Sequence, residues 1–347
     1  MQMSRIVFGS MQRGAGKTSV MAGLAANIGK DFGYLKPFGD RLIYFKKRLW
    51  DYDSALMTKA FGLTEEPESM SIGFEHAKLR YKYDEATTKE KLSDLANKMG
   101  QGKKALFIEG GTDLVYGSSV HLDALTISKD IGAGLVIVVN GTPATIMDDL
   151  HFLKHHVAMK GLDLKGVIIN KVHEIEEFRG TYVPDIQSLG HVVLGLVPFT
   201  EELTTTSVEY LVEQLFAKVV TEEGETKRVI KHIFVGAMSA NAALNEAAFK
   251  KGEKLLITSG DRSDMILAAF ETNTSCILLT NNILPPPNII AKAQDLHIPI
   301  LLVPWDTYET ANKVHALETL LRKDDKARLE LLKGLVKKHI DMKKLGL

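Results

Sequence analysis

A glycine-rich segment near the N-terminus has the residue types that bind phosphate. Residues 8–19 read FGSMQRGAGKTS, and glycines in such a loop let successive backbone N–H groups converge on phosphate oxygens. A lysine after the second glycine reaches the β- and γ-phosphates, and the next hydroxyl holds Mg²⁺. We therefore predict a phosphate-binding loop, or P-loop, whose nucleotide-contacting residues are Gly14, Ala15, Gly16, Lys17, Thr18 and Ser19.

The loop departs from the common pattern at one position but lies in the expected context. Met11 stands where the pattern has its first glycine. An apolar run at residues 6–9 precedes the loop and a helical pattern follows it, which is the strand–loop–helix order that a P-loop requires. The alternative is a glycine-rich turn that closes a strand over a helix.

A carboxylate ends another apolar strand. Residues 105–111 read ALFIEGG, so Glu109 would lie at the same edge of a parallel sheet as the loop. An acid at that place contacts Mg²⁺ or its water in P-loop proteins, which makes Thr18 and Glu109 candidate metal ligands. The alternative for Glu109 is a solvated acid at a strand end.

Apolar runs alternate with helical patterns over the first two thirds of the chain. We predict strands at residues 6–9, 34–36, 105–109, 135–139, 167–169 and 192–197. We also predict a helix at residues 18–30 that stops at Gly33. The fold class is therefore α/β, namely a P-loop NTPase-like, mostly parallel sheet with flanking helices, followed by a smaller α/β domain.

A charged segment at residues 221–228 separates this region from a second α/β pattern. Strands are predicted there at residues 233–235, 254–258, 276–280 and 300–303, with helices at 240–249, 263–270, 288–296 and from Tyr308. The domains would span residues 1–220 and 228–320, with an amphipathic helical tail at 321–347. The apolar face of that tail would pack on its own protein or on a partner, and the alternative is a frayed end.

Composition excludes several classes of protein. The 347 residues carry 43 basic and 43 acidic side chains and are 45% hydrophobic, so we expect no nucleic-acid partner and no wholesale disorder. We find no signal peptide and no apolar stretch long enough to span a membrane, and we expect no membrane partner. The single cysteine, Cys276, reads as a buried strand residue. A cytoplasmic protein is expected.

Five motifs occur in the order seen in dethiobiotin synthetase and its relatives. They are the P-loop and the segments at residues 33–38, 51–56, 108–111 and 167–172, and the resemblance covers residues 4–215. The second domain resembles the DRTGG domain at residues 235–239, 258–264 and 302–311. This pairing is similar to the N-terminal part of long bacterial phosphotransacetylases. The sequence stops at Leu347, before a matching catalytic domain, so acetyl transfer is not expected.

The resemblance implies roles for single residues and for cofactors. The catalytic set would be Lys17, Lys36 and Glu109, the Mg²⁺ ligands Thr18, Asp53 and Glu109, and Asn170 would face the nucleotide base. With ATP and Mg²⁺ as cofactors, such a site moves the γ-phosphoryl group to a small carboxylate or carbamate, because Mg²⁺ and two lysines neutralise its charge. The alternatives are a helix cap for Asp53, a surface lysine for Lys36 and a turn residue for Asn170.

Other positions depart from these families. Gln12 stands where related deviant P-loop ATPases carry a signature lysine, so the charge delivered across the expected homodimer would be missing unless Arg13 supplies it. The loops at residues 10–13 and 111–116 differ from those of dethiobiotin synthetase, so activity in the biotin pathway is not expected. Only Asp261 and Arg262 match the DRTGG motif itself.

The sequence therefore leaves two alternative functions open. One is an ATP-dependent ligase or synthetase, and the other is a non-catalytic nucleotide sensor that acts through the DRTGG-like domain. In that domain, residues 260–262 follow a strand and precede a helix. They would bind an anionic ligand, or Asp261 would cap the helix with Arg262 as its partner.

Two further groups of residues are interpreted as surface features. The basic run at residues 46–48 reads as a solvated helix face rather than a contact to phosphate or nucleic acid. His151, His155 and His156 lie on a helical pattern without partners at metal-ligand spacing, so they read as solvated or structural.

Overall fold

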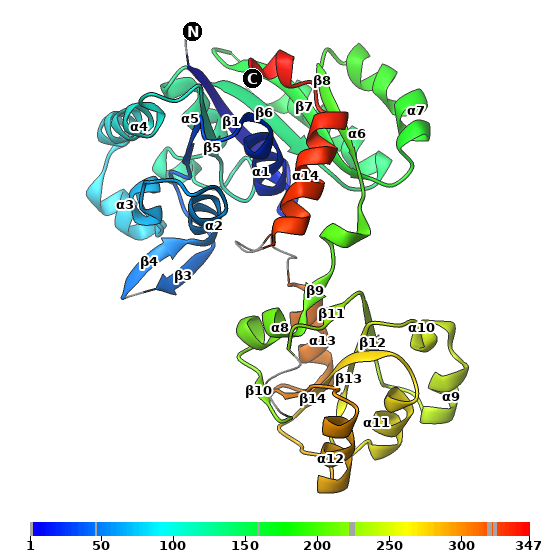
Figure 1. Ribbon diagram of the computed structural model, residues 1–347. Coiled ribbons are helices and arrows are strands. Elements are labelled where there is room, and N and C mark those ends of the chain that lie inside the picture. The colour runs from blue at the N-terminus through cyan, green and yellow to red at the C-terminus, as the bar shows by residue number, and fades with distance from the viewer. Residues whose placement is uncertain (1–2, 46, 158–159, 222–225, 318–320, 322–324) are drawn as a thin grey trace. The chain divides into compact units, whose positions relative to one another are not determined.

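The computed structural model describes the chain apart from residues 1–2, 46, 158–159, 222–225, 318–320 and 322–324 (Figure 1). It divides into two compact units. Unit 1 consists of Met1–Thr200 and Leu321–Leu347, and unit 2 is Glu201–Leu320. This division differs from the boundaries suggested by the sequence, since residues 321–347 belong with the P-loop region. Of the charged segment at 221–228, residues 222–225 lie outside the described residues.

Unit 1 contains a parallel sheet of six strands. Their spatial order is β2 (Phe32–Leu35), β5 (Ala105–Glu109), β1 (Ser4–Ser10), β6 (Gly134–Val139), β7 (Asp163–Val172) and β8 (Val193–Pro198). Every residue of β5 and β6 is buried, as expected for strands that are covered on both faces. The predicted α/β class with a mostly parallel sheet is confirmed.

Helices cover this sheet. They are α1 (Lys17–Ile28), α2 (Tyr52–Phe61), α3 (His76–Lys82), α4 (Glu85–Gly100), α5 (Ala124–Asp130), α6 (Pro143–His156), α7 (Ile175–Ser188) and α14 (Lys326–His339), with 3-10 turns at Pro67–Met70, Ser118–Val120 and Met342–Leu345. Helix α1 ends at Ile28, and its C-cap Gly29 has φ of 75° and ψ of −147°, a backbone conformation that essentially only glycine adopts. Gly33, predicted as the stop, lies instead inside β2.

The C-terminal segment completes unit 1. Helix α14 lies along α1 (Figure 1), and the Asn27 side-chain amide donates to the Lys333 carbonyl at 2.9 Å. Beyond the helix, Ile340 forms an antiparallel bridge with Gly195 of β8. The helix predicted near the C-terminus therefore packs on its own chain, and residues 322–324 of the predicted tail lie outside the described residues.

A two-stranded hairpin replaces the helix expected around the basic run. Strands β3 (Leu42–Phe45) and β4 (Arg48–Asp51) pair in antiparallel register and extend away from the sheet (Figure 1). Lys47 lies in the connecting turn with φ of 62°, Arg48 pairs with Glu68 at 3.0 Å, and residue 46 lies outside the described residues. The helix-face interpretation is wrong, because cross-strand pairing decides the structure of this short segment.

Unit 2 is a smaller α/β domain. Its sheet has the order β10 (Lys218–Val219), β15 (Ile300–Leu302), β14 (Thr274–Thr280), β13 (Lys254–Ser259) and β12 (His232–Val235), in which only the β10–β15 pair is antiparallel. Strands β9 (Thr206–Ser207) and β11 (Val229–Ile230) form a second small sheet, next to a 3-10 turn at Glu201–Leu203. The helices are α8 (Val208–Leu215), α9 (Ala240–Asn245), α10 (Ala247–Lys250), α11 (Ser263–Phe270), α12 (Pro287–Asp295) and α13 (Thr307–His315).

Two hydrophobic clusters cover the two faces of the unit 2 sheet. Leu256 and Ile277 belong to one cluster, and their strand neighbours Leu255 and Cys276 belong to the other, because successive strand residues point to opposite faces. Cys276 is buried in β14 as predicted. The single helix predicted at residues 240–249 is wrong, since Glu246 adopts an extended conformation and separates α9 from α10.

Candidate functional site

The P-loop lies between β1 and α1, as predicted. Gly14 has φ of 74° and Gly16 has φ of 92°, and this left-handed region is one that glycine enters without strain. Gly16 is the N-cap of α1 and Lys17 is its first residue. The loop therefore presents backbone at the positive end of a helix dipole, where anions are stabilised.

Two side chains of β7 brace the loop from the neighbouring part of the sheet. The Asn170 amide donates to the Ala15 carbonyl at 2.9 Å, and the Lys171 ammonium donates to the Gly14 carbonyl at 2.9 Å. A Cβ atom on Gly16 would lie 2.3 Å from the Asn170 amide nitrogen. Asn170 is thus a strand residue that touches the loop, not a turn residue, and Lys171 is a site residue that the sequence analysis missed.

Lys17 is buried and points back along the loop. Its ammonium donates to the Ser10 hydroxyl at 2.7 Å and to the Thr112 carbonyl at 3.3 Å. Burial lowers the pKa of Lys17, while the charge of Glu109 opposes that shift. Both of its partners are neutral oxygens, so an incoming phosphate offers this cation a stronger, charge-assisted interaction.

Glu109 receives one hydrogen bond on each carboxylate oxygen. The Thr18 hydroxyl donates to Oε1 at 2.8 Å, and the Tyr34 hydroxyl donates to Oε2 at 2.6 Å. Burial, followed by the charge of Asp53, raises the pKa of Glu109 to about 7, although Lys36 and Lys17 act in the opposite direction. A cation bound beside Glu109 would favour its deprotonated, charged form.

The pair formed by Thr18 and Glu109 fits a magnesium ion. Mg²⁺ prefers oxygen ligands and is commonly bound by one or two protein groups together with phosphate oxygens and water. A hydroxyl and a carboxylate oxygen 2.8 Å apart beside the P-loop supply that donor set. The third predicted ligand, Asp53, has cationic partners of its own.

Lys36 lies among three aspartates. Its ammonium is 2.5 Å from Asp40, 2.6 Å from Asp53 and 3.5 Å from Asp51, and Arg41 also contacts Asp53 at 3.4 Å. Burial alone would lower the pKa of Lys36, but the charges of Asp53 and Asp51 raise it well above its ordinary value. Lys36 is therefore a buried, charged residue and not a surface lysine.

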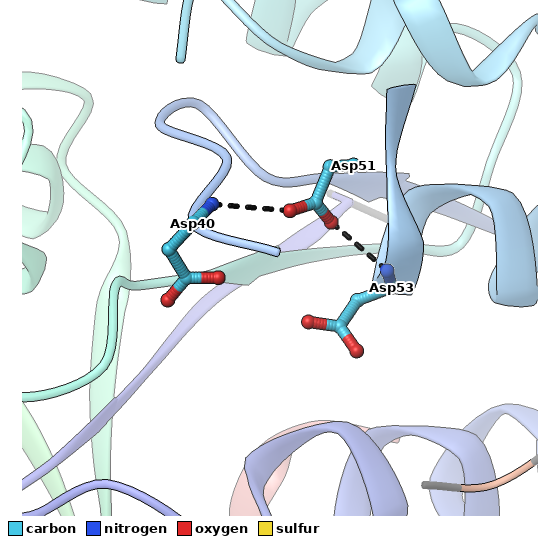
Figure 2. A group of neighbouring side chains, drawn as sticks. All are labelled: Asp40, Asp51 and Asp53. Atoms are coloured by element: carbon cyan, nitrogen blue, oxygen red, sulfur yellow. Dashed lines mark hydrogen bonds between the residues drawn. The ribbon is translucent and has the colours of Figure 1, made fainter. Parts of the chain in front are cut away.

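Asp51 organises this aspartate cluster. Figure 2 shows its carboxylate between the backbone nitrogens of Asp40 and Asp53, which donate to it at 3.1 and 2.9 Å. It also accepts from the Ser54 backbone and is the N-cap of α2, so the helix-cap alternative for Asp53 is wrong. The carboxylates of Asp40, Asp51 and Asp53 lie close enough to share a cation, and the Lys36 ammonium already fills that role.

Sequence reasoning missed Asp40, Arg41, Asp51 and Tyr34 as members of this network. The N-cap position of Asp51, directly before a helical pattern, is a signal that was available in the sequence. The contact of Tyr34 carries no such signal, because it depends on which strands become neighbours in the sheet. Asp40 lies only four residues after Lys36, and its contacts depend on how the segment after β2 folds.

In unit 2, the DRTGG-like residues lie at the end of β13 and the start of α11. Arg262, not Asp261, occupies the N-cap position of α11. The Arg262 guanidinium donates to the Met238 carbonyl at 2.7 Å and pairs with Asp264 at 3.2 Å. The bond to Met238 joins the segment between β13 and α11 to the segment after β12, so Arg262 has a structural role, with Met238 and Asp264 as partners in place of the predicted Asp261.

Two protein families match consecutive parts of the chain. The AAA domain family matches residues 5–207, and the DRTGG domain family matches residues 210–317. The first match covers more than half of the 347 residues, so the chain belongs to the AAA domain family. Its fold is that of a P-loop domain followed by a DRTGG domain.

The curated relatives that match the chain over most of its length are phosphate acetyltransferases. The enzyme of Nitrosomonas europaea is 22% identical over an alignment 356 positions long, which covers 94% of this chain and 49% of the relative. That of Deinococcus radiodurans is 22% identical over an alignment 370 positions long, which covers 99% of this chain and 51% of the relative. The chain spans about half the length of these relatives. The predicted resemblance to the N-terminal part of long phosphotransacetylases is confirmed.

Solved structures are more distant. The CBS and DRTGG domains of the regulatory region of Clostridium perfringens pyrophosphatase, solved with the activator diadenosine tetraphosphate, match 48% of this chain and 84% of that chain, with 14% identity and a TM-score of 0.30. A likeness of this size supports no conclusion about ligands. Within the described residues, we find no helix with the length and apolar character needed to cross a bilayer.

Proposed function

We propose that this chain binds ATP together with Mg²⁺ through the P-loop and Glu109. The observation that carries the proposal is the 2.8 Å contact between the Thr18 hydroxyl and Glu109, beside a loop with glycines in the left-handed conformation. The match of the AAA domain family to residues 5–207 supports it. Gly14, Ala15, Gly16, Lys17, Thr18 and Ser19 would contact the phosphates.

The residues in and beside the loop would have different roles in nucleotide binding. Lys17 would exchange its neutral partners, the Ser10 hydroxyl and the Thr112 carbonyl, for phosphate oxygens. Asn170 and Lys171 would keep the loop open by holding two of its carbonyl groups. When bound between Thr18 and Glu109, Mg²⁺ would neutralise charge on the β- and γ-phosphates.

Calorimetric titration of the whole chain with ATP, GTP and ADP, each with and without Mg²⁺, tests this proposal. We expect Mg²⁺-dependent binding that raises the melting temperature, because a ligand that binds only the folded state stabilises it. Lys17→Ala should abolish the binding. Lys165→Ala is the matched control, since Lys165 pairs with Asp163 at 2.7 Å on the surface. Absence of binding for all three nucleotides in the wild-type chain would contradict the proposal.

A second candidate function is phosphoryl transfer to a small carboxylate or carbamate. It is favoured by the common charge network of Lys17, Lys36 and Glu109, since the charges of Lys36 and Glu109 both act on the pKa of Lys17. The charge of Lys36, however, is already offset by Asp40 and Asp53. We therefore place nucleotide binding first and transfer second.

Measuring the release of ADP distinguishes an enzyme from a sensor. A ligase should release ADP only when a suitable carboxylate is present, and Lys36→Ala should stop that release. A sensor acting through the DRTGG domain should bind ATP without turnover and change its oligomeric state, which size-exclusion chromatography with light scattering would detect. The homodimer and the cytoplasmic location remain predictions from the sequence.

A further inference from the structure

Tyr34 contacts the candidate metal site without belonging to the P-loop. Its hydroxyl donates to Glu109 Oε2 at 2.6 Å, while the Thr18 hydroxyl donates to Oε1 at 2.8 Å. The two donors therefore fix the carboxylate from both of its oxygens. Thr18 would itself bind Mg²⁺, which leaves Tyr34 as the partner of Glu109 that stays in place whether or not the cation is bound.

The sheet holds Tyr34 at this position. Strand β2 runs parallel to β5, with Tyr34 opposite Phe107, and Glu109 is the last residue of β5. The Tyr34 side chain is 1% exposed, so its ring is fixed by packing. The hydroxyl thus reaches Glu109 in a single orientation, and little side-chain entropy remains to be lost when it forms this bond.

We propose that Tyr34 is a positioning residue for the magnesium site: its hydroxyl holds Glu109 Oε2 so that Oε1 faces Thr18 and the cation. The inference rests on the proposed binding of Mg²⁺ with ATP. Hydrogen-bond partners of metal-ligating groups keep those groups in the orientation that binds, and removing such a partner commonly lowers metal affinity by about 10–100-fold.

Tyr34→Phe removes only the hydroxyl oxygen and keeps the ring in the core. We expect the Mg²⁺ concentration that gives half-maximal ATP binding to rise about 10-fold or more. ATP binding in EDTA should stay the same, because Tyr34 has no role at the phosphates. Tyr182→Phe on α7 is the matched control, since it removes a phenol from the same unit, where Tyr182 contacts Phe178.

A double-mutant cycle shows whether Tyr34 acts through Glu109. In a Glu109→Gln background, Tyr34→Phe should produce no further rise in the Mg²⁺ requirement, because coupled residues are not additive. The cycle also remains informative if Tyr34→Phe lowers the melting temperature. Additive effects of the two substitutions would overturn the inference.

The measurements also distinguish failure of the role proposed for Tyr34 from failure of the proposed function. An unchanged Mg²⁺ requirement in Tyr34→Phe, or an equal loss of ATP binding with Mg²⁺ and with EDTA, overturns the role of Tyr34 but leaves the proposed function standing. Failure of wild-type protein to bind ATP in a Mg²⁺-dependent way removes the proposed function itself. Calorimetric titration of the full chain with ATP, in Mg²⁺ and in EDTA, measures binding for the wild type and for each variant.

Discussion

At the scale of single residues, Glu109 combines deep burial with a shared charge network. It lies at the end of β5, bonded to Thr18 and Tyr34, and its pKa is raised from 4.5 to about 7, first by burial and then by Asp53. Without a metal ion, the folded protein therefore holds a proton on Glu109 more tightly than the unfolded chain does. This difference makes stability depend on pH.

The sign of that dependence follows from the raised pKa. The stabilising contribution of protonated Glu109 is complete below pH 4.5 and is lost as the pH rises through about 7. Glu109→Gln has no carboxylate to ionise, so metal-free urea unfolding should favour the variant increasingly as the pH rises. Between pH 5 and pH 8 the difference in unfolding free energy should change by about 2 kcal/mol. Parallel pH profiles for the two proteins would contradict this.

Gly16 shows why the loop needs glycine at that position. It combines φ of 92° with a near contact, because an added Cβ atom would lie 2.3 Å from the Asn170 amide nitrogen. We expect Gly16→Ala to destabilise the fold by roughly 1–3 kcal/mol or more in urea unfolding and to impair ATP binding. Gly14→Ala is the control, since Gly14 shares the positive φ but meets nothing within 4 Å. Equal losses in the two variants would show that only the backbone conformation matters.

At the scale of elements, the contact between α1 and α14 places the C-terminal helix against the helix that follows the P-loop. Gly23 of α1 allows this close approach, because a Cβ atom there would lie 2.4 Å from Val336 and 2.9 Å from the Leu332 carbonyl oxygen. Gly334, on α14, has open space around it. The two helical glycines thus have different reasons to be glycine.

Alanine at these two positions should have opposite effects. In an exposed helix position, alanine is favoured over glycine by about 1 kcal/mol, so Gly334→Ala should raise the free energy of unfolding. Gly23→Ala gains the same propensity but must push α14 away, and overpacking of this kind costs about 1–3 kcal/mol. Urea unfolding monitored by circular dichroism measures both. An increase in stability for Gly23→Ala would show that the helices separate at no cost.

At the scale of the whole molecule, unit 1 is discontinuous in sequence. Met1–Thr200 and Leu321–Leu347 form it together, and the buried residues of its C-terminal segment include Leu332, Val336, Ile340 and Leu345. The Ser4 hydroxyl donates to the Gly346 carbonyl at 3.0 Å, so both chain ends lie in the same unit (Figure 1).

Truncation at residue 320 should therefore destabilise the P-loop unit. Each large apolar side chain removed from the core withdraws about 1.5–3 kcal/mol of burial, so we expect a loss of several kcal/mol in unfolding free energy and faster amide exchange in β8. Lys338→Ala serves as the control, because it changes an exposed side chain of α14. A truncated chain as stable as the full one would show that residues 321–347 are dispensable for unit 1.

The local features of the sequence were sufficient to predict much of this arrangement. Buried parallel strands have to be apolar along their whole length, so 105–109 and 135–139 stand out, and the P-loop has its glycines at the positions that need positive φ. The strand-to-helix junction at Lys17 follows from these same local signals. The prediction of a helix face at the basic run, residues 46–48, was wrong, because a short hairpin depends on pairing between its strands.

The amino-acid sequence was therefore sufficient to predict the α/β class, the P-loop and the acid at the end of β5, since each depends on a continuous stretch of residues. Three contacts are known only from the three-dimensional fold: Tyr34 bonds to Glu109, Lys36 lies among three aspartates, and α14 packs on α1. Tyr34 and Glu109 are 75 residues apart, and α1 and α14 lie near opposite ends of the chain, so the order of strands and the packing of helices, which no local pattern encodes, bring them together. Lys36 and its aspartates are closer in sequence, and their contacts depend on how the segment after β2 folds back on itself.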